Sequence, residues 1–348
     1  MFESFSQLHT YVFDAERIPV LIVAMLVTVI VGMITGPVRG NANPFIWQIL
    51  DVFLGGIGDR MNRKHRKKGD LIFRGFLLTA FILFLSSLFG KYFDFYFIPA
   101  GHSTYEIILI SLCLSSGAIW FSLLRLYFTM DKQGKASGAF FDIARTTRTN
   151  LNSVEDHGIT RCAMGLSATS LDKSMIAPSL WYLIGGVPLL LIYSALSALA
   201  WRFGNRGLGT GFGAVPLALE KIMGVVPSYL SGFLIVAASS LTPAARLFDG
   251  LRVLWDRKQT IPYEQNGITL KALSWSLKVT LGGAVQNIKG EKLPCDWVGP
   301  EGATAQINHK NLVRAIWINV ISHLLFVLIL LCAYIYTGKL FLMLDFIS

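Results

Sequence analysis

The sequence predicts an all-α fold: a polytopic helical membrane bundle of about six transmembrane helices, with amphipathic helical segments in the cytoplasm. Three observations predict it. Hydrophobic residues make up 53% of the 348 residues and charged residues 15%, and the mean hydropathy of +0.54 lies well above that of soluble domains. Six apolar runs approach the roughly 20 residues that cross a bilayer. Most of the 31 Lys and Arg residues lie in alternate connections between these runs.

The apolar runs predict the membrane helices in chain order. They cover residues 18–36, 75–90, 105–128, 179–201, 222–241 and 313–336. Pro227 breaks the fifth run, because proline lacks the backbone N–H that a helix needs. The sequence before the first run contains Glu3, Asp14 and Glu16 and one arginine, Arg17, whereas a cleavable signal peptide begins with a positive region. The first run is therefore expected to remain as a membrane helix.

The basic connections set the orientation. They occupy approximately residues 37–74, 130–178 and 243–312, and an excess of Lys and Arg marks the cytoplasmic side of a membrane protein. Both termini are then expected outside, and the whole chain, 1–348, is expected to form one integral membrane domain. The string over 140–164 has helix-compatible spacing on both sides of an Asn-Ser break, which predicts amphipathic helices lying at the membrane surface.

These connections explain the net charge of +10 without nucleic acid. The basic run RMNRKHRKKGD, residues 60–70, has no interleaved aromatic residue of the kind that a single-strand binder uses. Beside a membrane span, the run is expected to fix topology and to contact anionic lipid. Membrane lipids are therefore expected partners, and nucleic acid is not.

The four cysteines indicate neither a zinc site nor a disulfide framework. Cys113, Cys162, Cys295 and Cys332 lie far apart, without a CxxC pair. We expect all four to be small buried hydrophobic residues.

Six short segments follow one another in an order that is typical of a known family. They are NPFIWQILDVFLGGIGDRMNRK, EDHGITRCAMGLSATSLDKSMIAP, YSALSALAWRFGNR, LEKIMGVVPSYLSG, IPYEQNGI and LGGAVQ. Over roughly residues 35–330 the chain resembles the CobD/CbiB family, the membrane-bound adenosylcobinamide-phosphate synthases of cobalamin biosynthesis, to which AmpE-type membrane proteins are distantly related. The resemblance implies a multi-pass protein of the bacterial inner membrane.

The chain departs from the family pattern where the family carries charged or polar groups. The two family glutamates fall on Gly165 and Thr169, the asparagine on Ser170 and the aspartate on Lys173. A one-turn slip in the match would bring Asp172 onto the aspartate instead. Other changed positions are Ser197, Ala200, Lys221, Ile261 and Leu270, and kept positions include Glu220, Pro227, Pro262 and the turn from Leu281 to Gly283.

These departures bear on the activity that the resemblance implies, which is ATP-dependent joining of cobyric acid to an aminopropanol phosphate. Such chemistry needs carboxylates that hold Mg²⁺ against phosphate oxygens. We therefore expect a non-catalytic member without metal or cofactor, acting as an accessory, scaffold or signalling component with another membrane protein or a second copy of itself.

Two alternatives remain open. If the family activity persists, the protein is an amide-forming ligase or synthase that uses ATP and Mg, with catalytic residues that the sequence does not identify. The third possibility is a binder or carrier of an anionic lipid or a corrinoid-like ligand.

Six residues are candidates for ligand or anion binding: Glu155, Asp156, Arg161, Thr169, Asp172 and Lys173. Lys173 and the neighbouring hydroxyls form a cationic, polar strip just before the fourth span, suited to an anion at the membrane surface. The competing interpretation is a solvated loop whose lysine faces lipid phosphates.

The remaining acidic residues suit no metal site. Glu155 and Asp156 are adjacent on a helix, so their side chains point in different directions, which favours an acidic turn or helix start. Glu220 is expected on the outer side, in a local ion pair with Lys221 and Arg206.

Two further patterns concern helix packing. In the sixth span, Asn319, Ser322 and His323 share one face, which predicts hydrogen bonds to a neighbouring helix. The glycine pair at Gly185 and Gly186 predicts a close approach between helices, since no phosphate-binding motif surrounds it.

Overall fold

The structure is a computed structural model, and it describes residues 16–63, 65–97, 103–133, 136, 138–204, 207–243, 245–256, 261–265, 267–288, 290–293 and 295–345. The interpretations that rest on Glu3, Asp14, Lys64 and Arg206 lie outside these residues. The α-helices are α2 (Arg17–Thr35), α3 (Phe45–Met61), α4 (Lys68–Phe97), α5 (Ser103–Cys113), α6 (Gly117–Gln133), α7 (Phe140–Thr147), α8 (Asp156–Leu171), α9 (Ala177–Phe203), α10 (Ala214–Ser239), α11 (Leu247–Trp255), α12 (Gly267–Leu277) and α13 (His309–Asp345). A π-helical turn, η1 (Asp172–Ile176), joins α8 to α9, and η2 (Leu208–Thr210) and η3 (Tyr263–Gln265) are 3₁₀ turns.

The all-α membrane fold is confirmed. Within the described residues, six helices are long and apolar enough to cross a membrane. They are Arg17–Thr35, Lys68–Phe97, Ser103–Lys132, Asp156–Phe203, Ala214–Ser239 and His309–Thr337. Each overlaps one of the six runs predicted from hydropathy, because a run of apolar residues is a local property of the sequence.

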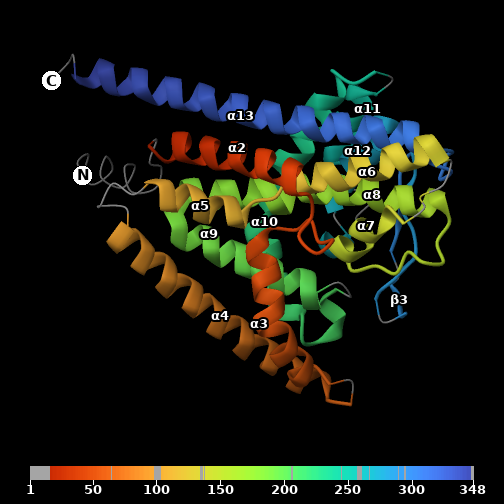
Figure 1. Cartoon of the computed structure of the whole chain (residues 1–348), viewed down its shortest axis with the longest axis horizontal. Coiled ribbons are helices and arrows are strands. Elements are labelled where there is room, and N and C mark those ends of the chain that lie inside the picture. The colour runs from red at the N-terminus through yellow and green to blue at the C-terminus, as the bar shows by residue number, and fades with distance from the viewer. Residues whose placement is uncertain are drawn as a thin grey trace.

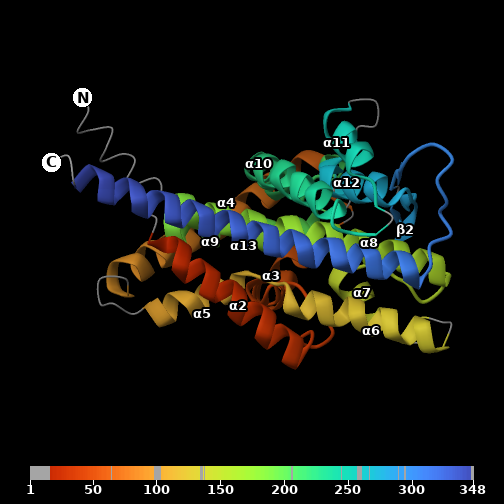
Figure 2. The same ribbon diagram turned by 90° about the horizontal axis from the view of Figure 1, so that it is seen from above.

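The helices form an elongated bundle. In Figure 1, α13 follows one long edge, α4 lies at the opposite edge, and α9 and α10 lie between them. The beginning of α2 and the end of α13 share one end of the molecule, while α7 and the strands lie at the other end in both views (Figures 1 and 2). The strands are two-residue pairs: β1 (Leu281–Gly282) with β4 (Trp297–Val298), and β2 (Val285–Gln286) with β3 (Lys292–Leu293), all antiparallel.

The fourth candidate span folds back on itself. Ser170, before η1, and Ser197, in α9, line the same cavity, although a straight helix would hold them about 40 Å apart. The reversal occurs at Gly185 and Gly186, where Gly186 has φ +63° and ψ −155°, a region that only glycine readily adopts. The pair permits a turn, and Gly186 also approaches other helices as expected, since an added Cβ would lie 3.5 Å from Arg17 of α2 and from Asp94 of α4.

Helix α8 corrects the expectation of a surface helix over 140–164. Two helices do form on either side of a break, α7 and α8, as the spacing predicted. However, Ile159, Ala163 and Met164 on α8 are buried, and α8 packs against α13, α12 and α7. The helix belongs to the core because it continues through η1 into α9, and its apolar side faces the bundle.

The polar face of α13 binds neighbouring helices, as predicted. Asn319 Nδ2 donates to the Ser167 carbonyl at 2.6 Å, and Trp120 Nε1 donates to Asn319 Oδ1 at 2.7 Å. Ser322 Oγ donates to the Leu234 carbonyl at 3.2 Å. These bonds fasten α13 to α8, α6 and α10, which form one side of the site described next.

Helices α2 and α6 cross at two glycines. A Cβ on Gly32 would lie 2.3 Å from the Ala118 backbone nitrogen, and a Cβ on Gly117 would lie 2.2 Å from the Val29 carbonyl oxygen. Only hydrogen fits at both positions, so the two backbones approach closely, as small residues allow in membrane helices.

Candidate functional site

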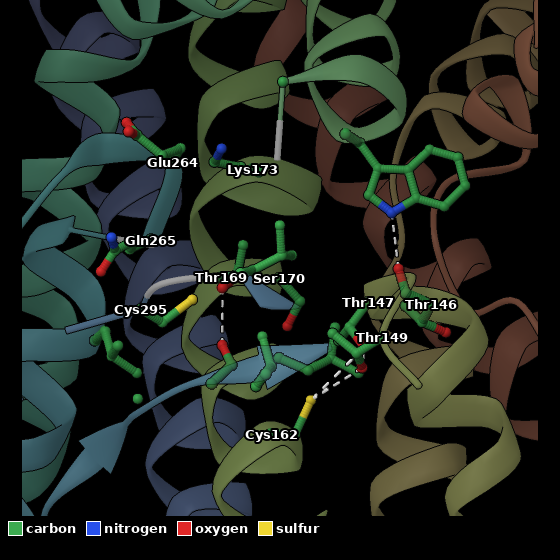
Figure 3. A pocket seen from close by; sticks show the side chains of 18 of the residues that line it. Thr146, Thr147, Thr149, Cys162, Thr169, Ser170, Lys173, Glu264, Gln265 and Cys295 are labelled. Atoms are coloured by element: carbon green, nitrogen blue, oxygen red, sulfur yellow. Dashed lines mark hydrogen bonds between the residues drawn. The ribbon is translucent and has the colours of Figure 1, made fainter. Parts of the chain in front are cut away.

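A cavity of about 250 Å³ lies where α8, η1, the second arm of α9 and the strands meet. Figure 3 shows side chains from these elements pointing into it, including Thr169, Ser170 and Lys173 from the α8–η1 junction and Cys295 from the segment before β4. Asn150 N donates to the Gln286 carbonyl at 2.8 Å, which ties the connection after α7 to β2 beside the cavity. The lining therefore comes from segments that are far apart in the sequence.

Most of the positions marked by the family resemblance converge on this cavity. Its lining includes Gly165, Thr169, Ser170, Lys173, Ser197, Ala200, Glu220, Leu270, Gly282 and Gly283. These residues are spread over more than a hundred positions of the sequence. Their meeting in one cavity supports the register of that match.

An ion pair occupies one wall of the cavity. Lys173 Nζ lies 3.2 Å from Glu220 Oε1 and donates to Oε2 at 3.3 Å. The Glu220 residue is 0% exposed and the Lys173 side chain is 14% exposed. Lys173 lies in a helical turn, which rules out the competing interpretation of a solvated loop, and Glu220 pairs with Lys173 rather than with Lys221. The reversal at Gly186 brings η1, α9 and α10 together and so explains both differences.

Tyr263 closes the ion pair from the η3 side. Lys173 Nζ lies 4.4 Å from the centre of the Tyr263 ring, and the Tyr263 hydroxyl donates to the Glu220 carbonyl at 3.5 Å. Burial, and then the charge of Glu220, raises the pKa of the Tyr263 phenol well above its ordinary value. A Cβ on Gly224 would lie 2.1 Å from this hydroxyl, so glycine there is what lets the ring cross α10.

Asp172 and Lys173 are the first two residues of the π-helical turn, and their side chains have different partners. Asp172 Oδ2 accepts a hydrogen bond from Ser228 Oγ at 2.5 Å, and Oδ1 accepts one from Ser231 Oγ at 3.3 Å, both from α10. Asp172 is buried and does not line the 250 Å³ cavity, whereas Lys173 does. Asp172 therefore supplies no carboxylate to the cavity in place of Lys173.

The six candidate residues fall into two groups. Arg161, Thr169 and Lys173 line the cavity. Arg161 Nη1 donates to the Ala305 carbonyl at 2.9 Å, and its guanidinium lies 5.0 Å from the Trp297 ring centre. Thr169 Oγ1 donates to the Gly165 carbonyl at 2.8 Å.

Glu155 and Asp156, with Asp172, lie away from the cavity lining. Glu155 is the N-cap residue of α8, in extended conformation, and Asp156 is the first residue of the helix. Asp156 Oδ1 accepts a hydrogen bond from the Ala136 backbone N–H at 3.0 Å. The two carboxylates thus mark a helix start, where negative charge is favourable.

Sequence reasoning missed a cluster of hydroxyls and thiols in the lining. Thr147 Oγ1 and Thr149 Oγ1 lie 2.6 Å apart, and each lies 3.6 Å from Cys162 Sγ (Figure 3). Cys295 also lines the cavity. The expectation that all four cysteines are buried holds for Cys113 but not for Cys332, which is exposed on α13, nor fully for the two in the cavity.

Burial, with the nearby charge of Asp296, raises the pKa of the Cys295 thiol. Cys295 therefore carries less thiolate at neutral pH than an ordinary cysteine does.

Two tryptophans form an apolar wall. The rings of Trp47 on α3 and Trp201 on α9 are 6.1 Å apart between centres. Trp201 Nε1 donates to the Thr146 carbonyl at 2.8 Å, and the Arg148 guanidinium lies 5.0 Å from the Trp201 ring centre. These contacts fix the indole against the connection after α7. The wall offers flat apolar surface beside the threonine hydroxyls, a lining that suits an amphiphilic ligand.

The carboxylates of the lining belong to Glu220, Glu264 and Asp296, and Glu220 is paired with Lys173. In the part of the chain that the structure describes, no group of three or more His, Cys, Asp or Glu side chains is placed to hold a metal ion.

Comparison with known proteins gives a consistent result. The family model described as CobD/Cbib protein matches residues 21–319. The chain is 24% identical over 222 residues to the cobalamin biosynthesis protein CobD of Clostridium perfringens, covering 62% of this chain and 69% of that protein. It is 23% identical over 227 residues to CobD of Rhizobium meliloti, covering 62% and 68%. It is 26% identical over 154 residues to the probable CobD of Methanothermobacter thermautotrophicus, covering 43% and 50%. No solved structure matches the chain.

Proposed function

Because this chain belongs to the CobD/CbiB family of cobalamin biosynthesis proteins, we propose that it is a diverged member that keeps the family cavity without its ATP-dependent chemistry. It is a multi-pass membrane protein, and we place it in the bacterial inner membrane. There it acts as an accessory, scaffold or signalling component, in contact with membrane lipids and with another membrane protein or a second copy of itself.

The observation that carries the proposal is the ion pair between Lys173 and Glu220. The resemblance puts an aspartate at the position of Lys173, where a metal-dependent synthase would present a carboxylate. Here a cation stands 3.2 Å from Glu220, the acidic residue of the cavity lining that the match retains. Lys173 neutralises the charge of Glu220 and donates a hydrogen bond to Oε2, which weakens the carboxylate as a ligand for a hard cation.

The remaining donors do not compensate for this loss. Gly165, Thr169 and Ser170 replace two carboxylates and an amide, and Thr169 bonds its own helix backbone. The other two lining carboxylates, Glu264 and Asp296, belong to η3 and to the residue before β4. These donors do not fit Mg²⁺ held against the phosphates of ATP.

The cavity itself is retained, which favours binding over loss of all function. Its lining combines two tryptophans with the hydroxyls of Thr147, Thr149 and Ser170. Such a cavity can hold a ligand without turning it over, and the bound state can then alter contacts with a partner.

The alternative is a working adenosylcobinamide-phosphate synthase, or a related amide-forming ligase, that uses ATP and Mg. The convergence of the matched positions on one cavity favours it, since the site has not been dismantled. Its catalytic residues would have to be other members of the lining, with Glu264 and Asp296 as the available carboxylates.

Complementation separates the two. A bacterial strain that lacks its own synthase receives this chain, the C. perfringens CobD as positive control, or an empty vector, and growth is measured under cobalamin-requiring conditions. Membrane expression and folding are checked by an epitope tag and size-exclusion chromatography. We expect no growth beyond the vector level. Growth comparable to the positive control would overturn the proposal and identify the chain as a synthase.

A further inference from the structure

A second cavity, of about 450 Å³, adjoins the first on the other side of η1. One wall is a single face of α10, formed by Lys221, Val225 and Tyr229 at successive i, i+4 positions. The opposite wall is the segment from Ile261 to Tyr263 with the start of α12. The inner end is polar and includes Thr169, Lys173 and Ser228.

This second cavity opens on the outward surface of α10. Val225 is 44% exposed, and its neighbour Val226, which does not line the cavity, is 71% exposed. Ile222 and Phe233 continue the same exposed apolar surface along a helix that is apolar enough to cross a membrane. A surface of this kind on a membrane helix faces hydrocarbon, so the groove is reached from the lipid side.

The charges along the groove leave one cation available. Lys173 is paired with Glu220, and the Asp172 carboxylate accepts hydrogen bonds from Ser228 and Ser231. Lys221 is exposed at the mouth and has no ion pair among the residues that the structure describes. The mouth therefore carries a positive charge beside apolar side chains.

We propose that this groove binds one anionic phospholipid. The phosphate lies at Lys221, and an acyl chain lies along Val225 and Tyr229 toward Ile268. A basic side chain beside apolar surface matches the two parts of such a lipid, as snorkelling lysines do elsewhere at membrane interfaces. This site is separate from the proposed function, because it needs neither catalysis nor its loss in the first cavity.

The lipid would lie next to the first cavity. Thr169 and Lys173 line both spaces, and Tyr263, which lines the second, closes the ion pair of the first. The partition is therefore one layer of side chains thick, so a lipid in the groove contacts the same lysine that pairs with Glu220.

Native mass spectrometry of the full chain tests the proposal. The protein is purified in mild detergent and titrated with phosphatidylglycerol or, separately, phosphatidylcholine of the same acyl chains. Lys221→Gln removes the charge, with Lys310→Gln at the exposed start of α13 as its matched control. Val225→Trp fills the groove, with Val226→Trp, an exposed residue of the same helix outside the groove, as its matched control.

We expect one phosphatidylglycerol adduct, bound more tightly than phosphatidylcholine. Lys221→Gln should weaken it about fivefold, the effect of one basic side chain beside an anionic lipid, and Val225→Trp should abolish it. Both controls should bind as the parent does. Equal binding in all variants, equal binding of the two lipids, or displacement by millimolar inorganic phosphate alone would overturn the proposal. Since Lys221 is exposed, its variant remains informative even if Val225→Trp fails to fold.

Discussion

Lys173 Nζ and Glu220 Oε1 lie 3.2 Å apart, although the two residues belong to separate helices and the chain reverses direction between them. Inside a helical bundle each residue would carry an uncompensated charge without the other, and the pair compensates both. It also gives the cavity a neutral wall where the resemblance implies an acidic one.

Removing one partner should destabilise the protein more than removing both. Lys173→Met or Glu220→Leu leaves one buried charge, at an expected cost of about 3–5 kcal/mol. The double variant Lys173→Met/Glu220→Leu should recover most of that loss, because an apolar pair of similar volume can replace a buried ion pair. Thermal unfolding in detergent measures the three variants, with Lys310→Met as an exposed control. A double variant no more stable than either single one would contradict the pairing.

Glycine at 186 should be required for the reversal of α9. Gly186→Ala places a side chain at φ +63° and ψ −155°, with an expected cost of about 1–3 kcal/mol from backbone strain alone, since the atoms nearest to the added Cβ lie at 3.5 Å. Gly56→Ala in α3 is the matched control, because nothing lies within 4 Å and alanine favours a helix by up to about 1 kcal/mol. The melting temperature should fall for Gly186→Ala and stay the same or rise for Gly56→Ala. The same change in both variants would contradict the turn at Gly186.

Cys295 should react slowly with alkylating reagents. Its thiol pKa is raised by burial and then by Asp296, so at a given pH less thiolate is present than in a free cysteine, and the rate should keep rising with pH beyond the point where a free thiol levels off. Asp296→Asn removes a negative charge, lowers the pKa and should speed the reaction at pH 8. Peptide-resolved mass spectrometry after iodoacetamide treatment measures the rates, with N-acetylcysteine as reference. A rate unchanged by Asp296→Asn would show that this charge does not act on Cys295.

The glycine crossing of α2 and α6 should tolerate no methyl group. Gly32→Ala and Gly117→Ala each place Cβ against backbone of the other helix, which cannot move aside, so we expect a loss of about 1–3 kcal/mol for either. Gly69→Ala in the first turn of α4 meets nothing within 4 Å and serves as control. Melting temperatures in one detergent compare the three, and a Gly32→Ala variant as stable as the control would mean that the helices do not cross here.

The fold class and the positions of the spans could be predicted from the sequence because both depend on local hydropathy. The polar face of α13 could also be predicted, since Asn319, Ser322 and His323 recur at helical spacing. The family resemblance marked single positions of the cavity lining, the first at Gly165 and the last at Gly283. That these positions meet in one cavity is visible only in the folded chain.

What could not be predicted depends on backbone geometry. The turn at Gly186 rests on two dihedral angles, and nothing in the hydropathy of 179–201 separates a bent helix from a straight one. The π-helical turn decides that Lys173 lines the cavity and Asp172 does not, a choice that a one-residue shift in helix phase would reverse. Tyr263 lies in the matched segment IPYEQNGI, but neither it nor Cys295 is a position that the family pattern marks, and neither segment has helical periodicity.

The cavity lining begins at Asn43 and ends at Asp296, which gives the site an order of assembly. While the chain is being synthesised, Lys173 leaves the ribosome before its partner Glu220, and the strand segment that completes the lining comes later still. Contacts between such distant segments form slowly, and until they form the half-built site exposes a lone cation. An interrupted or truncated chain would therefore display that cation within its membrane helices, a defect by which cellular quality control could distinguish an unfinished copy from a finished one.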